Sequence, residues 1–225
     1  MWRGGPHLRG ANVHLRRVYP EIDGADFFGP GPFGPPATQQ DFDRLAASGA
    51  NYVELSHPGI FAEGAPYVLD VGALANLDRL LNFAAQADLY AVIAFRTEPG
   101  RSEFTFHPGE EDTWFPGDLV NNAVWTDDDA KQGWVDMWAF AAQRYRNSGI
   151  VVGYELMVEP NGATTGLRGD SPGEFVEQHS GGPYDRGDFF PRILEGIREV
   201  DARTARRAIA RHRSSDHRVP SPERS

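Results

Sequence analysis

The sequence contains no cysteine, a single lysine (Lys131) and no long apolar segment. Without cysteine, a disulfide scaffold and a cysteine-ligated metal site are excluded, although the compartment stays open. Residues 1–9 lack the apolar core of a signal peptide, and no run of about 18 apolar residues suggests a membrane span. The seven histidines show no metal-ligand spacing. We therefore expect a chain that is cytoplasmic as written, with no membrane partner, no metal and no cofactor.

Positive charge is scarce outside the last 25 residues. Residues 201–225 contain seven arginines and three acidic residues, a balance of +4, so the net charge of −10 leaves −14 on residues 1–200. An acidic body argues against nucleic acid, because phosphate binding depends on clustered Lys and Arg. The basic segment also has no aromatic interleaving of the kind that would support reading it as a nucleic-acid arm. We expect no nucleic-acid partner.

The same segment marks a domain boundary. Residues 201–225 have no apolar periodicity and should be disordered or weakly helical. Their composition is what translation of GC-rich DNA in a wrong frame would give, and a genuine basic extension is the alternative. We expect one domain over residues 1–200 and a separate tail over 201–225.

Residues 1–200 alternate between short apolar runs and segments of helical period, as βα units do. Thr38 with Asp41 forms a capping pair, and Gly49 suits the end of that helix. Thr126 with Asp129 predicts a second capping pair. Long loops are expected at 24–36 and 96–125, and loops of such length are typically functional. The predicted strands are 8–13, 51–56, 89–95 and 150–157. The predicted helices begin after Thr38, near Asp70, after Thr126 and at Phe189, and the last two run to about Tyr145 and to Val200.

Four βα units fit either a doubly wound sheet or part of a β/α barrel. The doubly wound nucleotide-binding type needs a glycine-rich turn after the first strand, whereas residues 14–21 read HLRRVYPE. Barrel enzymes place polar residues at the carboxyl ends of their strands, and such residues follow all four predicted strands here. The pattern predicts a (β/α)₈ barrel, truncated after about four units.

The fourth strand carries the most specific motif, GYELMVEPN over residues 153–161. Together with RGAN near the first strand, NYVELS at the second and VIAFRTEPGR at the third, it resembles glycoside hydrolase family 5, over roughly residues 8–200 and in the N-terminal half only. The resemblance implies that Glu159 is the general acid/base of a retaining, two-carboxylate mechanism. It also implies a glutamate nucleophile at the end of the seventh strand, which this chain does not reach.

Two positions depart from the family pattern. Val158 stands where the family has an asparagine that contacts the sugar 2-hydroxyl, and Glu54 stands where its second strand carries arginine. Arg96 on the third strand offers a positive charge in compensation, and we expect it to pair with Glu54 or Glu155.

The other candidate residues lie at strand ends and in the long third loop. Aromatic faces in that loop can stack on sugar rings, with loop packing as the alternative, whereas Trp134 and Trp138 share a helical stripe and are expected in the core. The candidate substrate-binding residues are Asn12, His14, His57, Arg96, Trp114, Trp125 and Asn161.

The expected activity is hydrolysis of O-glycosidic bonds in a β-linked glucan, mannan or related glycoside, with little turnover by this chain alone. The main alternative is a non-catalytic truncated barrel that at most binds carbohydrate. An aldolase is excluded because Lys131, the required amine, falls on a predicted helix, and a metal-dependent isomerase lacks its ligand cluster. A part-barrel also exposes unpaired sheet edges, which favour self-association.

Overall fold

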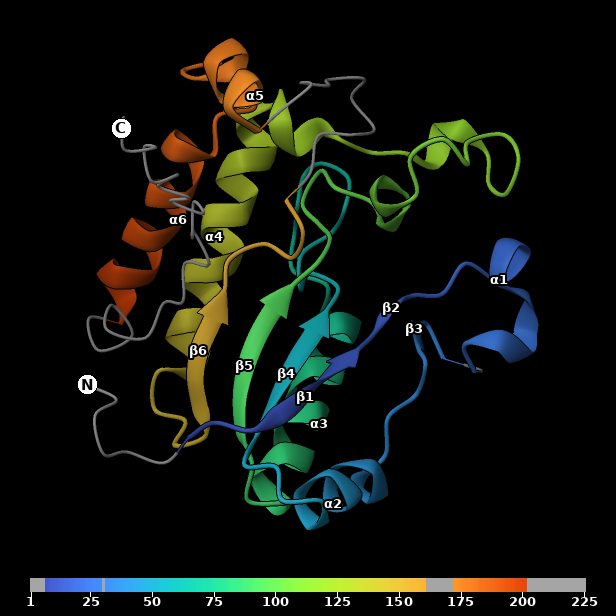
Figure 1. The fold of residues 1–225 in the computed structure, drawn as a ribbon, viewed down its shortest axis with the longest axis vertical. Helices are drawn as coiled ribbons and strands as arrows, with labels where there is room; N and C mark the ends of the chain where they lie inside the picture. The colour runs from blue at the N-terminus through green and yellow to red at the C-terminus, as the bar shows by residue number, and fades with distance from the viewer. Residues whose placement is uncertain (1–6, 30, 161–171, 202–225) are drawn as a thin grey trace, which may run out of the picture.

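The computed structural model describes residues 7–29, 31–160 and 172–201. Its centre is a sheet of four parallel strands, β1 (Gly10–His14), β4 (Tyr52–His57), β5 (Tyr90–Phe95) and β6 (Val151–Glu155). They lie side by side in that order (Figure 1). The register aligns Asn12 with Glu54, and Glu54 with Val92. All four predicted strands are confirmed.

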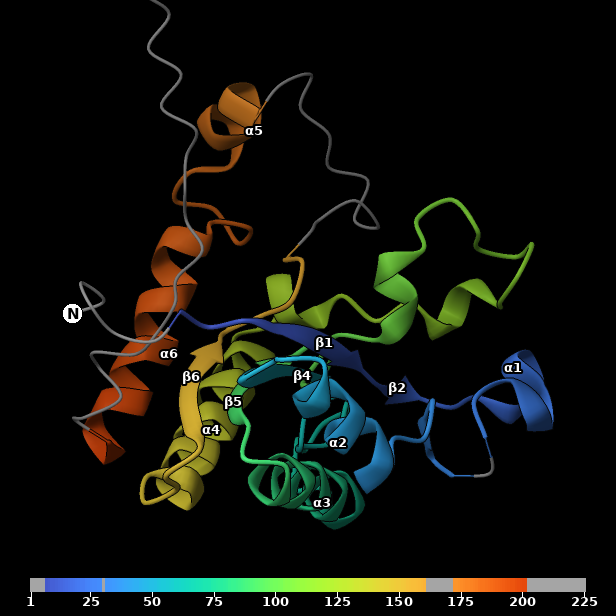
Figure 2. The ribbon, with the colours of Figure 1, turned by 60° about the horizontal axis from the view of Figure 1, so that its bottom comes forward.

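Helices cover one face of this sheet, as Figure 2 shows. They are α2 (Gln39–Ala47), α3 (Val71–Gln86) and α4 (Asp128–Tyr145), with α6 (Arg186–Val200) packed beside α4. The strand–helix alternation and the parallel order fit a TIM-barrel-type fold. Across the described residues the sheet does not close on itself.

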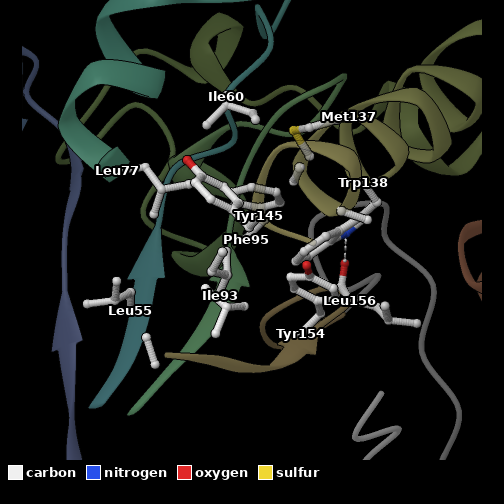
Figure 3. Close-up of a cluster of buried hydrophobic side chains, with 14 of the residues drawn as sticks. Leu55, Ile60, Leu77, Ile93, Phe95, Met137, Trp138, Tyr145, Tyr154 and Leu156 are labelled. Atoms are coloured by element: carbon white, nitrogen blue, oxygen red, sulfur yellow. Dashed lines mark hydrogen bonds between the residues drawn. The ribbon is translucent and has the colours of Figure 1, made fainter. Parts of the chain in front are cut away.

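The core lies between the sheet and the helices. Ile93 and Phe95 of β5 are fully buried, which explains the nearly continuous apolar run of that strand. Trp134 and Trp138 of α4 are also fully buried, as the helical stripe predicted. The Trp138 indole Nε1 donates a hydrogen bond of 2.9 Å to the carbonyl oxygen of Leu156, just beyond β6 (Figure 3). Helix α4 therefore anchors the carboxyl end of β6.

Local capping signals were mostly right. Thr38 and Asp41 form the predicted capping box, Gly49 has φ +91°, and Asp70 caps α3 through the amides of Gly72 and Ala73. Helix α4 is different, because the Asp127 carboxylate, not Thr126, accepts from the backbone N–H of Asp129. The positive end of the helix dipole also stabilises a carboxylate at this position.

Three segments differ from the prediction. Residues 24–36 are not simply a loop, because α1 (Pro20–Phe27) and β3 (Phe33–Gly34) occupy the region, and β3 pairs with β2 (Arg16–Arg17). Helix α5 (Pro172–His179) was not predicted, and α6 begins before Phe189. The long loop after β5 contains three 3₁₀ turns, η1 (Glu103–Phe106), η2 (Gly117–Leu119) and η3 (Ala123–Trp125). The tail over residues 202–225 lies outside the described residues.

Candidate active site

The carboxyl ends of the four parallel strands meet at one edge of the sheet, where the loops carry the candidate residues (Figure 1). His14 is the last residue of β1 and Asn12 lies at its middle, Arg96 directly follows β5, and Glu159 lies four residues beyond β6. Strand polarity alone therefore gathers these groups, because parallel strands all end on the same side.

Glu159 is exposed and has an unusual backbone. Its φ is +43°, a left-handed conformation that non-glycine residues rarely adopt and that clusters at functional sites. One residue earlier, the Val158 N–H donates to the Phe95 carbonyl at 2.9 Å, so contact between the β5 and β6 ends continues up to this point. The segment that carries the Glu159 carboxylate is thus held to the end of β5 by this hydrogen bond.

The guanidinium of Arg101 also holds this segment, through backbone carbonyls. Arg101 is fully buried and donates from Nη1 to the carbonyls of Arg96 and Val158 at 2.7 and 2.8 Å, and from Nη2 to the carbonyl of Glu159 at 2.7 Å. The sequence offered little to single out this residue beyond an arginine in a long loop after a buried strand.

Arg96 forms its ion pair with Glu103, from Nη2 to Oε1 at 2.8 Å, and its guanidinium also lies 4.2 Å from the centre of the Phe106 ring. The prediction of Glu54 or Glu155 as its partner was wrong, because η1 folds back over the end of β5 and brings Glu103 to the guanidinium. Glu54 accepts a hydrogen bond from Asn12 Nδ2 at 2.7 Å instead. Arg96 therefore does not supply the positive charge expected at Glu54.

His14 is kept neutral near physiological pH. Partial burial, followed by the charges of Arg96 and Arg16, lowers the pKa of its imidazole to about 4. A neutral imidazole can donate or accept a hydrogen bond from a sugar hydroxyl without carrying charge. Its position beside Asn12 at an open sheet edge suits a binding role.

A second polar network was not predicted from the sequence. Arg17 donates to Glu98 at 2.5 Å and to Asp70, the α3 cap, at 2.8 Å. Glu98 is 1% exposed, and burial raises its pKa to about 7 although Arg17 opposes the shift. Glu98 also has a left-handed backbone, with φ +53°. This network joins β2, the end of β5 and the start of α3 beneath the candidate site.

Two predicted substrate-binding residues are core residues. His57 is 0% exposed, and its ring is hydrogen-bonded to the Pro58 carbonyl and the Asn76 side chain of α3. Trp125 is 3% exposed and packs against Tyr184 and Phe189. Neither side chain can contact a ligand in this conformation, because neighbouring residues already surround it.

Trp114 is different, because 43% of its surface is exposed, although its ring lies nearly perpendicular to those of His107 and Phe115, with centroid distances of 4.7 and 5.6 Å. Asn161 lies outside the described residues. In the described ranges, no group of three His, Asp or Glu side chains could hold a metal ion. No helix in that part of the chain is both long and apolar enough to span a membrane.

Comparison with known proteins identifies the family. The model of Cellulase (glycosyl hydrolase family 5) matches residues 9–209, most of the 225-residue chain. The chain belongs to glycosyl hydrolase family 5.

Individual relatives agree with that assignment. A probable glucan 1,3-beta-glucosidase A of Aspergillus niger is 32% identical over 130 residues, which cover 55% of this chain and 28% of that protein. A solved glycoside hydrolase matches with TM-score 0.60 and 18% identity, over 87% of this chain and 50% of the other. Endoglucanase Cel5A of Pseudomonas stutzeri matches with TM-score 0.57 and 16% identity, over 90% and 51%.

The two solved structures show a shared fold. The chain spans under a third of the curated relative and about half of each solved chain.

Proposed function

We propose that this chain supplies the acid/base half of a retaining glycosidase site, with Glu159 as the residue that protonates the leaving-group oxygen. The observation that carries the proposal is the placement of an exposed Glu159 just beyond β6, with its carbonyl bound by the Arg101 guanidinium and the preceding Val158 N–H bound to the Phe95 carbonyl. A general acid must be held in position relative to the scissile bond, and such a strand end meets that requirement.

We propose that Glu54, Glu98 and Glu103 do not supply the second carboxylate of the pair. Retaining enzymes hold two carboxyl groups about 5–5.5 Å apart. Here Glu54 accepts from Asn12, Glu98 is bound by Arg17 and Thr97, and Glu103 is paired with Arg96. Because each of these carboxylates already binds another side chain, we propose that residues 1–225 alone have little or no turnover.

The substrate we propose is a β-linked glucan, mannan or related glycoside. The name of the Aspergillus relative refers to a β-glucan, which supports this class. Trp114 offers a partly exposed aromatic ring, and Asn12 and His14 offer hydrogen bonds to hydroxyl groups. Val158 cannot donate or accept through its side chain, so the 2-hydroxyl contact of the family must be replaced or absent.

The same observation favours a second candidate, a protein that binds carbohydrate without cleaving it. Loss of a hydrogen bond that strengthens in the transition state reduces catalysis more than binding. Under this alternative Trp114 and His14 hold the sugar and Glu159 takes no part in chemistry.

Covalent labelling tests the role of Glu159 without requiring turnover. N-bromoacetyl-β-glucosylamine places an electrophile where the leaving-group oxygen of a β-glucoside lies, so it should alkylate a carboxylate in the acid/base position. Mass spectrometry should find one adduct, on Glu159, that forms more slowly in excess cellobiose and is absent from Glu159→Gln. Sugar binding with no adduct at Glu159 would support the non-catalytic alternative.

Turnover gives a complementary measurement. Residues 1–225 should show little hydrolysis of aryl β-glucosides, aryl β-mannosides or soluble β-glucans. Efficient turnover that vanishes in Glu159→Gln would show that a second carboxylate is already present. In a longer, active protein, Glu159→Ala should stop cleavage of unactivated glycosides, spare substrates with activated leaving groups, and recover partly with azide.

We also propose that the chain self-associates through the outer edge of β1. β1 is an outer strand of the sheet in the described residues, and an exposed strand edge is a template for pairing with another chain. Sedimentation velocity should show dimers or larger species whose fraction rises with concentration, and a concentration-independent monomer would contradict this proposal.

A further inference from the structure

Arg101 is a buried cation whose hydrogen bonds go to backbone carbonyls of two different strand ends. It bridges the carbonyl of Arg96, after β5, to the carbonyls of Val158 and Glu159, after β6, with all three distances between 2.7 and 2.8 Å. The Val158 and Glu159 acceptors lie 57 and 58 residues away in the sequence. The contact is therefore a cross-brace between separate βα units.

Burying this charge is costly. Desolvation, followed by repulsion from Arg96, lowers the pKa of Arg101 to about 9, while Glu103 and Glu159 act in the opposite direction. The guanidinium lies 4.5 Å from the Phe106 ring centre, and its Nε has no hydrogen-bond partner among the described residues. An apolar side chain of similar volume would fill this buried position without the free-energy cost of desolvating a charge. The arginine is better explained by the conformation that it imposes.

The segment before Arg101 is built as a rigid support. The Glu98 N–H donates to the Arg101 carbonyl at 2.8 Å, and the Trp134 indole donates to the Pro99 carbonyl at 2.7 Å. Gly100 has φ +67°, and a Cβ at this position would lie 2.7 Å from Ala130 Cβ. A side chain at position 100 is thus excluded by both backbone and packing. The turn aims Arg101 at the β6 end with little freedom to move.

We propose that Arg101 is a positioning residue that fixes the backbone of Glu159 for proton transfer. This role rests on the proposed function, in which Glu159 is the acid/base. The planar fork of arginine donates from two nitrogens in a fixed geometry and so holds both strand ends together. Without it, the left-handed Glu159 is free to relax, and its carboxyl group moves away from the scissile bond.

Lysine at position 101 keeps the charge but loses the fork, so Arg101→Lys is the test variant. Arg144→Lys is the matched control, because it makes the same substitution at an arginine of α4 whose fork binds Asp78 of α3, outside the turn that carries Arg101. Two readouts are compared on residues 1–225. One is the rate at which N-bromoacetyl-β-glucosylamine alkylates Glu159, and the other is amide hydrogen exchange of Val158 relative to amides in the centre of β4 and β5.

We expect Arg101→Lys to slow alkylation of Glu159 roughly 100-fold, the loss typical of a displacement of about 1 Å at a reacting group. Exchange at Val158 should accelerate about tenfold more than exchange at the sheet centre, because the local brace and not global stability is lost. Arg144→Lys should leave exchange at Val158 unchanged relative to the sheet centre and the alkylation rate of the folded protein within about a factor of three.

The outcomes separate the two proposals. No adduct at Glu159 in the wild-type chain overturns the proposed function and, with it, this role of Arg101. A wild-type adduct that forms equally fast in Arg101→Lys overturns the role of Arg101 alone. Should Arg101→Lys not fold, Arg101→Gln, which retains a planar amide donor, is measured in the same way. Failure of both variants to fold while Arg144→Lys folds would also overturn the proposal and leave Arg101 a role in folding only.

Discussion

The acid sensitivity of the fold should depend on His57. This side chain is 0% exposed in the core between β4 and α3, and burial lowers the pKa of its imidazole from 6.5 to about 4. Hydrogen bonds to Pro58 and Asn76 and the charge of Asp70 oppose the shift, while Arg17 adds to it. The folded protein therefore holds His57 neutral, whereas the unfolded chain protonates it near its ordinary pKa.

This difference in pKa decides how the unfolding free energy changes with pH. A histidine with a depressed pKa contributes stability that is complete above pH 6.5 and is lost as the pH falls toward 4. The shift corresponds to roughly 3 kcal/mol of unfolding free energy over the whole window, of which about 2 kcal/mol is lost by pH 5. Because the ring is fully buried, solvent screening does not reduce this figure greatly.

Urea unfolding measured from pH 8 to pH 4.5 tests the magnitude. His57→Gln removes the titrating group but keeps a side chain that can bond to Asn76, so its unfolding free energy should fall less steeply with pH than that of the wild type. Other groups titrate in the same window, including His14 and Glu98, and subtraction of the two curves removes their contribution. His7→Gln, at an exposed position, controls for the loss of a histidine as such.

Parallel curves for the wild type and His57→Gln, offset by a constant, would refute the reasoning. That result would mean that the folded state protonates His57 as readily as the unfolded chain does, either because α3 opens locally or because water reaches the ring. Amide exchange at Asn76 would distinguish these two causes.

Two further changes test the networks at the strand ends. Arg96→Met should lower the unfolding free energy by about 3–5 kcal/mol, because Glu103, with 5% of its side chain exposed, is left charged without its partner. The double variant Arg96→Met/Glu103→Leu should recover most of that loss in urea titrations, and additive losses would contradict the pairing. Asp70→Ala should cost about 1–2 kcal/mol through the lost cap of α3, plus a smaller loss from Arg17, whereas Asp70→Asn should retain most of the capping contribution. Equal destabilisation by both substitutions would show that the charge, not the cap, matters at this position.

Local signals in the sequence were reliable where neighbouring residues make the contact. The Thr38–Asp41 capping box, the start of α3 near Asp70 and the apolar run of β5 depend on groups a few residues apart, or on a strand being covered by helices. At α4 the same logic chose Thr126 over the adjacent Asp127, an error of one residue. Signals of this kind determine which element forms and are less certain about its first residue.

The contacts made by residues at the strand ends could not be predicted from the sequence. His57 is the last residue of β4, where substrate-binding residues in barrels are expected, but its side chain bonds to Asn76 of α3 and is buried. Arg96 was correctly expected to find a carboxylate, but the choice of Glu103 depends on how η1 folds back over β5. Strand alternation predicts which residues share a face and says nothing about the path of a 30-residue loop.

The sequence by itself determined the alternation of strands and helices, the buried stripe of α4 and the family, because these depend on periodicity and on a motif that is contiguous in the chain. Only the tertiary structure decided what holds Glu159. The bridge from Arg101 joins residues that lie 57 and 58 positions apart and ends on backbone carbonyls, which every residue has and which therefore leave no mark in the sequence.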